Sequence, residues 1–355
     1  MSFTVLSIAY PLAPTSPDSV GGSEKVLAEL DRALVACGHT SLVVAAQRSE
    51  IAGRLWPVSV PARDVLAEED RRFVRAQMQA AIDAALSSAR GSIDLVHMHG
   101  LDFADYRVPP DLPVLTTLHL PISWYPAEIW QRMRPNVHFC CVSQSQRAAA
   151  PERLRDCAVV ENGVALPPFD PSAARERFAL VMGRICPEKN QHAALDAGTR
   201  AGVPVYLAGQ VFPYREHKEY FEQQIQPRLM ELEPGHRFLG PLTAERKQEL
   251  LARACCLLHP TLAPETSSLV AMEALAAGTP VIAYRSGALP EIVEHGRTGL
   301  LVDGVETMAG AIDAVGRIAP AECRAVAERR FSRERMVAGY FDLYRTLTQR
   351  VRAYA

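Results

Sequence analysis

The most constraining feature of this sequence is a strand, glycine loop, helix and strand unit that recurs along the chain. At its first occurrence, an apolar strand (Phe3–Tyr10) leads to Gly21-Gly22, and a helical pattern over Ser23–Cys37 precedes a second strand at Thr40–Ala46. Strands joined through a helix pair in parallel, because the helix carries the chain back along the sheet. The pattern therefore predicts an α/β fold with doubly wound parallel sheets, which bind ligands at the carboxyl ends of their strands.

This alternation stops at a proline-rich segment, Leu166–Pro171, and then restarts. A chain of 355 residues is long enough for two domains. We therefore expect one Rossmann-like domain over residues 1–165 and a second over residues 166–334. The cleft between two such domains is the natural place for a ligand.

Composition and charge argue against several classes of partner. The chain is 48% apolar with a formal net charge of −2, so nothing in it favours nucleic acid or an anionic membrane. The N-terminus reads as a strand, not as a signal peptide, and no apolar run reaches the roughly 20 residues that span a bilayer. A helical pattern over Asp64–Arg90 carries both charge signs, which favours a solvated face. We expect a cytoplasmic protein with at most peripheral membrane contact.

The cysteines and acidic motifs predict no metal site. None of the eight cysteines forms a Cys-x-x-Cys pair, and several lie in apolar strand patterns, as reduced core cysteines do. The chain also lacks the Asp-x-Asp pair that would hold a divalent metal on a diphosphate. We therefore expect neither a metal nor another cofactor.

Two glutamates in the second half, Glu265 and Glu273, stand seven residues apart. A small-residue helix pattern surrounds Glu273, so its charge needs a hydrogen-bond partner. The helix should begin near Ser267, where the free N–H groups of Ser267, Ser268 and Leu269 form an anion site beside Glu265. This suits a ligand with hydroxyls and phosphate, such as a nucleotide sugar. The alternative is a structural ion pair between Glu273 and an arginine, with Glu265 a loop carboxylate.

A pair of cations precedes this stretch. Arg184 and Lys189 lie five residues apart on the loop Gly183–Asn190, which joins a predicted strand to a predicted helix. Arginine can bind phosphate with two parallel hydrogen bonds and lysine supplies a point charge, so the pair suits a diphosphate. Two surface cations are the alternative, but the glutamates in the same domain favour the ligand.

Polar residues also follow strands of the first domain. His119 ends a predicted strand and is either a ligand contact or structural, whereas His97 and His99 are interpreted as structural. The sequence leaves open whether three aromatic residues stack on a sugar or pack in the core: Trp124, Tyr125 and Trp130.

These residues carry a family likeness that covers nearly the whole chain. The chain resembles the retaining glycosyltransferases of family 4, whose GT-B architecture has two Rossmann-like domains facing a central cleft. The motifs that carry the resemblance are Gly21–Glu24, Asp94–His97, Thr117–His119, Val142-Ser143, Glu161–Gly163, Gly183–Asn190, Phe238–Gly240, the Glu265/Glu273 pair, Gly278–Ala283 and Pro290–Val293. The resemblance implies that the last helix, over residues 335–355, crosses back onto the N-terminal domain.

The resemblance also implies a role for each matching residue. Arg184 and Lys189 would hold the donor diphosphate and stabilise it as a leaving group. Glu265 would contact the donor sugar and Glu273 the ribose hydroxyls, while His119 would face the transferred sugar. The remaining donor-site candidates are Gly21, Gly22, Gly183, Leu239, Ser267, Ser268 and Leu269.

The implied reaction is metal-independent transfer of a sugar from a UDP- or GDP-sugar to an acceptor hydroxyl, with retention through same-face attack. The acceptor could be a saccharide, a lipid-linked or a small molecule. Two departures bear on sugar choice: Thr266-Ser267-Ser268 replaces the frequent Gly-Phe-Gly, and Ser286-Gly287-Ala288 has one glycine where two are common. The alternatives are a nucleotide-sugar epimerase of the same architecture and a non-catalytic nucleotide-sugar-binding protein.

Overall fold

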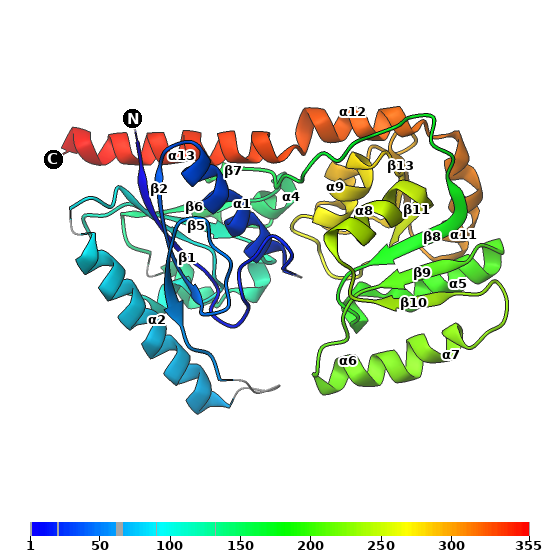
Figure 1. Cartoon of the computed structure of the whole chain (residues 1–355), viewed down its shortest axis with the longest axis horizontal. Coiled ribbons are helices and arrows are strands. Elements are labelled where there is room, and N and C mark those ends of the chain that lie inside the picture. The colour runs from blue at the N-terminus through cyan, green and yellow to red at the C-terminus, as the bar shows by residue number, and fades with distance from the viewer. Residues whose placement is uncertain (1, 20, 62–66, 90, 132, 355) are drawn as a thin grey trace. The chain divides into compact units, whose positions relative to one another are not determined.

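The chain divides into two compact units in the computed structural model, which describes residues 2–19, 21–61, 67–89, 91–131 and 133–354 (Figure 1). One unit comprises Met1–Asn162 together with Glu334–Ala355, and the other comprises Gly163–Arg333. Each unit is built on one parallel sheet with helices on both faces, as the alternation of strands and helices predicts.

The first unit contains a seven-stranded sheet with the order β3-β2-β1-β4-β5-β6-β7, in which all neighbours are parallel. Its strands are β1 (Thr4–Ile8), β2 (Thr40–Ala46), β3 (Arg54–Val58), β4 (Leu95–Met98), β5 (Val114–Leu118), β6 (Val137–Cys141) and β7 (Ala158–Val159). Its helices are α1 (Gly22–Ala36), α2 (Glu68–Ser88), α3 (Ala127–Gln131), α4 (Gln144–Ala148) and α13 (Arg333–Tyr354), with 3₁₀ turns at Phe103–Asp105, Ile122–Trp124 and Glu152–Leu154.

Alternate residues of β1 enter different hydrophobic clusters. Val5 packs with residues of α1 and α13, whereas Leu6 packs on the opposite face with Met78 of α2. This two-sided burial explains why the strands read as continuous apolar runs. The order of strands reverses between β1 and β4, which is where sheets of this class bind ligands.

The last helix, α13, packs on the first unit, as the resemblance implied. Its Tyr340 and Tyr344 are fully buried in a cluster with Phe3 and Val5. The hydroxyl of Tyr344 also lies 2.8 Å from Nδ1 of His97. The chain therefore returns to its first domain after completing the second. Residue 355, the end of the predicted helix, lies outside the described residues.

The second unit contains a six-stranded parallel sheet with the order β10-β9-β8-β11-β12-β13. Its strands are β8 (Glu176–Met182), β9 (Val205–Ala208), β10 (Arg237–Gly240), β11 (Ala254–His259), β12 (Val281–Tyr284) and β13 (Gly299–Val302). Its helices are α5 (Gln191–Ala201), α6 (Arg215–Tyr220), α7 (Gln226–Leu229), α8 (Ala244–Arg253), α9 (Leu269–Ala276), α10 (Leu289–Ile292), α11 (Val305–Ala314) and α12 (Pro320–Arg330), with 3₁₀ turns at Pro187–Lys189 and Val315–Arg317 and a π-helical turn at Phe221–Ile225.

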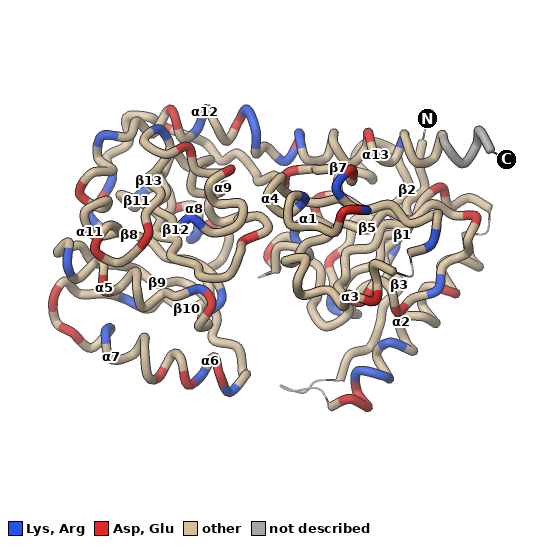
Figure 2. The backbone as a smooth tube through the Cα atoms, turned by 180° about the vertical axis from the view of Figure 1, so that it is seen from behind, with Lys and Arg blue, Asp and Glu red and all other residues tan. Residues whose placement is uncertain are grey.

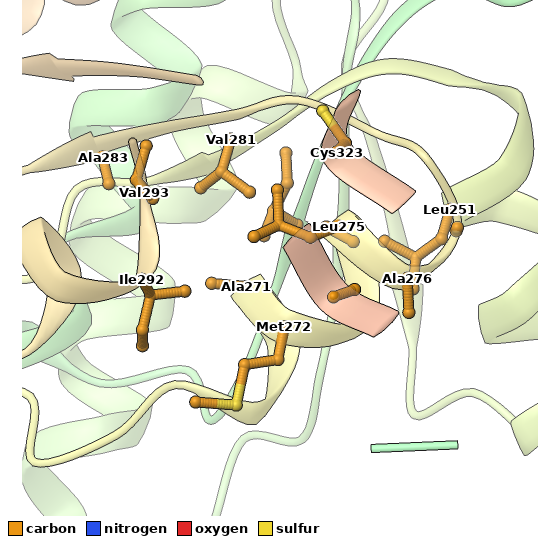
Figure 3. Packing of buried hydrophobic residues seen from close by; sticks show 14 of the residues in the cluster. Leu251, Ala271, Met272, Leu275, Ala276, Val281, Ala283, Ile292, Val293 and Cys323 are labelled. Carbon is orange, nitrogen blue, oxygen red and sulfur yellow. The ribbon is translucent and has the colours of Figure 1, made fainter. Parts of the chain in front are cut away.

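Helix α9 is largely buried, and its small residues let it approach the sheet closely. Leu275 lies in one cluster with Val281 of β12 and Cys323 of α12 (Figure 3). Gly278 ends the helix: its φ is 74°, and its N–H donates to Leu275 O at 2.9 Å. This packing fixes the direction in which the first turn of α9 points.

The ends of some elements differ from those that the sequence pattern predicts. The pattern over Tyr214–Met230 predicts one long helix, and the structure has a continuous helical segment in which a π-helical turn separates α6 from α7, next to Pro227, which lacks an N–H for regular helix bonding. The pattern also predicts a strand at Val58–Val60, but β3 ends at Val58. Helix α2 occupies the core of the predicted segment, and Asp64–Leu66 and Arg90 lie outside the described residues.

Acidic and basic residues are interspersed along both units, in agreement with the small net charge (Figure 2). Along α2, for example, Glu68 of the first turn pairs with Arg75 at 2.9 Å. Among the described residues, none of the helices combines the length and apolar composition needed to cross a bilayer.

Candidate functional site

The loops that follow β8 and β11 are bonded to each other at the carboxyl edge of the second sheet. These strands are neighbours at the reversal of strand order, the position of ligand sites in open α/β sheets. The carbonyl of Glu188 accepts hydrogen bonds from Leu262 N at 2.9 Å and Thr261 Oγ1 at 3.2 Å. Asn190, with a left-handed φ of 56°, donates from Nδ2 to Pro260 O at 3.1 Å. These hydrogen bonds therefore fix the two loops relative to each other at this edge of the sheet.

Lys189 and Glu265 meet at this edge. Nζ of Lys189 donates a hydrogen bond to Oε1 of Glu265, and His259 Nε2 lies 3.5 Å from the same oxygen. The side chain of Glu265 is only 12% exposed. Burial by itself would raise the pKa of Glu265, but the hydrogen bond from His259 and the charge of Lys189 outweigh burial and lower that pKa to about 2. An ionised carboxylate thus stands beside a cation at neutral pH.

A third loop, after β12, holds the backbone of Glu265. The carbonyl of Glu265 accepts a hydrogen bond from Ala288 N at 2.7 Å, and Ser286 Oγ donates to Ala263 O at 2.7 Å. Gly287 has a φ of 55°, and a Cβ there would lie 2.1 Å from Glu265 O. Gly287, the single glycine in Ser286-Gly287-Ala288, is therefore the residue at which the close approach of Glu265 O requires glycine.

The first turn of α9 begins at Leu269, two residues later than predicted. Ser268 caps the helix, because its Oγ accepts a hydrogen bond from Ala271 N at 3.3 Å. The same Oγ lies 3.2 Å from His259 Nε2. Helix geometry leaves the N–H of Leu269 without a partner inside the helix. Ser267 Oγ is buried and has no hydrogen-bond partner among the described residues, so it can still bind a ligand.

Glu273 forms an ion pair, but its partner is a lysine and not the arginine considered above. Nζ of Lys247 in α8 donates to Oε1 of Glu273 at 2.5 Å. Both side chains remain about one-fifth exposed. A partly exposed pair can accept a further hydrogen bond from a hydroxyl, so the ion pair and a ligand contact are compatible.

Arg184 lies on the same loop as Lys189 and is less engaged. Its guanidinium lies 3.7 Å from Glu188 Oε1 and the side chain is 40% exposed. Nε2 of Gln191 donates a hydrogen bond to the backbone carbonyl of Arg184 at 2.6 Å. Gly183 precedes it with a φ of 149°, and nothing lies within 4 Å of a Cβ built there. Leu239 lies in β10, which β9 separates from β8, and it is partly buried.

His119 belongs to the first unit, where it follows β5. Its Nε2 lies 3.1 Å from Nδ1 of His99, and the two rings are stacked. Burial lowers the pKa of His119 to about 4, so the ring is neutral at pH 7. His97, by contrast, is fully buried between Thr117 and Tyr344. His99 is therefore a neighbour of a candidate site residue as well as a core residue.

Gly21 and Gly22 open helix α1 after β1. Gly21 is the cap of the helix, and a Cβ there would lie 1.9 Å from Glu24 Oε2. Gly22 is its first helical residue and is exposed.

The structure also shows whether the three aromatic residues of the first unit are buried or exposed. Tyr125 and Trp130 pack in the core with Phe139, whereas Trp124 is 47% exposed.

Sequence reasoning missed His259 and Lys247. His259 is the last residue of β11, so the rule that selected His119, a polar residue at the end of an apolar strand, would also have found it. Lys247 carries no such signal, because it lies on an amphipathic helix among other charged residues. Only the packing of α8 against α9 brings it to Glu273.

Comparison with known proteins identifies the family of the chain. The family described as "Glycosyl transferases group 1" matches residues 168–323, and that described as "Glycosyltransferase Family 4" matches residues 20–166. A D-inositol 3-phosphate glycosyltransferase from Corynebacterium urealyticum is 40% identical over 119 residues, which is 31% of this chain and 28% of that protein. Matches to such curated relatives therefore span less than two thirds of the relatives' length.

Solved structures share the fold over almost the full chain. Sucrose-phosphate synthase from Thermosynechococcus elongatus is similar with a TM-score of 0.76 and 20% identity, covering 97% of this chain and 99% of that one. The Anabaena protein HepE, solved in complex with UDP and glucose, is similar with a TM-score of 0.72 and 18% identity. The match covers 96% of this chain and 99% of that one. Together with the two adjoining family matches, which extend over residues 20–166 and 168–323, this shows that the chain belongs to the GT-B glycosyltransferases of family 4.

Proposed function

We propose that this protein is a retaining glycosyltransferase that moves a sugar from a UDP- or GDP-sugar to an acceptor hydroxyl without a catalytic metal. The observation that carries the proposal is the Lys189–Glu265 pair at the β8/β11 edge, beside the first turn of α9. A cation, a carboxylate and free helix N–H groups together match a ligand that carries both phosphate and hydroxyls.

In this proposal the diphosphate is bound by Arg184, Lys189 and the first turn of α9. An ammonium group has three N–H donors, so Lys189 can keep its bond to Glu265 while it donates to phosphate oxygens. Arg184 is exposed enough to turn from Glu188 toward the same anion. These cations would stabilise the negative charge that develops on the leaving phosphate, the largest contribution that such a site can make to the rate.

The sugar and the ribose would be bound by the two glutamates. The pKa of about 2 keeps Glu265 an acceptor for donor-sugar hydroxyls, and Gly287 and Ala288 fix its backbone. Glu273, the fifth residue of α9, would accept from the ribose hydroxyls. The acceptor hydroxyl would attack on the face from which the phosphate departs, and the departing phosphate would take its proton. His119, neutral at pH 7, would hydrogen-bond the transferred sugar.

A donor and acceptor screen with product analysis tests the proposal. UDP-, GDP- and ADP-sugars would be incubated with acceptors that include D-inositol 3-phosphate, which appears in the names of the curated relatives. We expect one donor to be consumed only when an acceptor is present, and NMR to show that the new bond keeps the donor's anomeric configuration. An inverted product would contradict retention. Conversion of the donor to an epimer without an acceptor, or binding without turnover, would favour the two alternative functions.

A further inference from the structure

A second cluster of potential ligands includes two residues of the loop that carries Arg184 and Lys189. Cys186, Glu188 and His217 each offer one ligand atom, and these atoms all lie within 4.8 Å of one another. Cys186 and Glu188 belong to the loop after β8, and His217 belongs to α6. His217 is distant in sequence from the other two residues, so the cluster is brought together by the fold.

The backbone explains why the residues meet. The loops after β8 and β9 run side by side, since Gly183 N donates to Ala208 O at 3.1 Å and Ile185 N donates to Gln210 O at 3.0 Å. Gly209 allows this approach, because a Cβ there would lie 1.8 Å from Gly183 O. The loop after β9 then leads into α6, whose third residue is His217.

The side chains are buried as metal ligands are. Cys186 is fully buried and His217 is only 7% exposed. Nδ1 of His217 is buried and has no hydrogen-bond partner among the described residues, which costs free energy unless a ligand supplies one. Cys186 and Glu188 already contact each other and Arg184: the Cys186 thiol hydrogen-bonds the Glu188 carboxylate, Cys186 Sγ lies 3.5 Å from Arg184 O, and Glu188 Oε1 lies 3.7 Å from the Arg184 guanidinium.

We propose that Cys186, Glu188 and His217 form a binding site for a thiolate-preferring divalent cation, of which Zn²⁺ is the best candidate. Sulfur, imidazole nitrogen and carboxylate oxygen are the ligands that Zn²⁺ takes, and three protein ligands leave a fourth position for water. Mg²⁺ and Ca²⁺ prefer oxygen ligands alone. Binding would release the Cys186 thiol proton to solvent and would fasten the loop that carries Arg184 and Lys189 to α6.

This site is distinct from the predicted metal-free transfer. Its ligands are Cys186, Glu188 and His217, and the transfer step proposed above uses none of these side chains. The cation would order the donor loop without contacting the reacting sugar. A failure of the metal proposal therefore leaves the proposed transferase activity standing, and the reverse also holds.

Metal titration of the full chain tests this site. The purified protein, freed of metal by chelation and dialysis, would be titrated with Zn²⁺ against a chromophoric chelator and with Co²⁺ for a sulfur-to-cobalt charge-transfer band. We expect one tightly bound ion per chain and a Tm that rises with Zn²⁺. Cys186→Ser and His217→Ala should each weaken binding by at least about 100-fold, more than the loss of an outer contact costs. His217→Gln provides a second variant if the alanine variant folds poorly.

The matched control is Cys37→Ser, which removes an exposed thiol far from the cluster in sequence. This variant should bind Zn²⁺ and show the cobalt band as the wild type does. The proposal is overturned if the wild type binds no stoichiometric Zn²⁺, or if Cys186→Ser and His217→Ala bind as tightly as Cys37→Ser.

Discussion

Lys189 Nζ is hydrogen-bonded to Glu265 Oε1 although the two residues are 76 positions apart in the chain. The bond joins the loops after the two strands at which the order of the second sheet reverses. His259 contacts the carboxylate of Glu265, and the β12 loop holds its backbone carbonyl through Ala288 N. The pair thus combines a fixed cation with a fixed acceptor at the point where a sheet of this class receives its ligand.

Replacing Lys189 should slow transfer by removing support for the leaving phosphate. We expect Lys189→Ala to lower kcat/KM by about 100-fold or more, comparable with the loss of one preorganised donor, as measured by steady-state kinetics. Arg200→Ala serves as the control because Arg200 forms an exposed ion pair with Glu306 at 3.1 Å. Near-wild-type kinetics for Lys189→Ala would refute its role.

Arg184→Ala should have an effect of similar size, roughly 100-fold on kcat/KM, if both cations contact the diphosphate. Arg184 has only a weak contact with Glu188 in the folded chain, so its removal should change Tm little. Steady-state kinetics and thermal unfolding of the same preparation separate the two effects. A large fall in Tm would instead assign Arg184 a structural role.

Gly287→Ala should displace Glu265. The added Cβ would press on the Glu265 carbonyl at a residue whose φ already disfavours a side chain. We expect a stability loss of about 1–3 kcal/mol in urea unfolding and a raised KM for the donor. Gly310→Ala is the control, since Gly310 lies inside α11 with open space around it, and alanine there should stabilise the helix. Equal behaviour of the two variants would contradict the proposed support of Glu265.

The pKa of Glu265 predicts a pH dependence of stability. Its pKa falls from the model-peptide value of 4.5 to about 2 on folding, so ionisation stabilises the folded state above pH 4.5. This contribution should disappear as the pH falls from about 4.5 toward 2. Urea unfolding of wild type and Glu265→Gln should therefore show a stability difference that is largest near pH 7 and shrinks in acid. A difference that grows in acid would be inconsistent with the lowered pKa.

Removal of Mg²⁺ and Mn²⁺ should leave the transfer rate unchanged, because Arg184, Lys189 and α9 would balance the diphosphate charge. The rate would be measured with EDTA and after addition of each ion. A strong loss restored by Mg²⁺ would contradict metal-free transfer. A loss restored by Zn²⁺ and not by Mg²⁺ would point instead to the Cys186 cluster, because Mg²⁺ does not suit a thiol site.

The sequence predicted candidate residues on the loops that precede helices. Arg184 and Lys189 were selected because their loop joins a predicted strand to a predicted helix, and Glu265 because it precedes a predicted helix start. The sequence did not predict two other contacts. The Glu273–Lys247 bond depends on how α8 packs against α9, and the approach of His217 to Cys186 depends on how the loops after β8 and β9 pair, which no local pattern records.

Some features of the fold escaped prediction for a similar reason. Helix α12 was missed because it buries only Cys323, Val326 and Ala327, so its apolar pattern is weak among charged residues. Tyr125 and Trp130 could not be assigned to the core from their types, since aromatic residues serve both cores and sugar sites. Their assignment required the contacts with Phe139.

Calorimetric titration of nucleotides tests the central claim most directly. UDP, GDP, ADP and their glucose, mannose and N-acetylglucosamine conjugates would be titrated into wild type, Glu273→Ala and the surface control Glu306→Ala. The account predicts that one nucleotide class binds the wild type and the control with one site per chain, and that Glu273→Ala weakens this binding by about tenfold, or 1.4 kcal/mol. No binding of any nucleotide by the wild type, or equal binding by Glu273→Ala, would contradict a donor site at the edge formed by β8, β11 and α9.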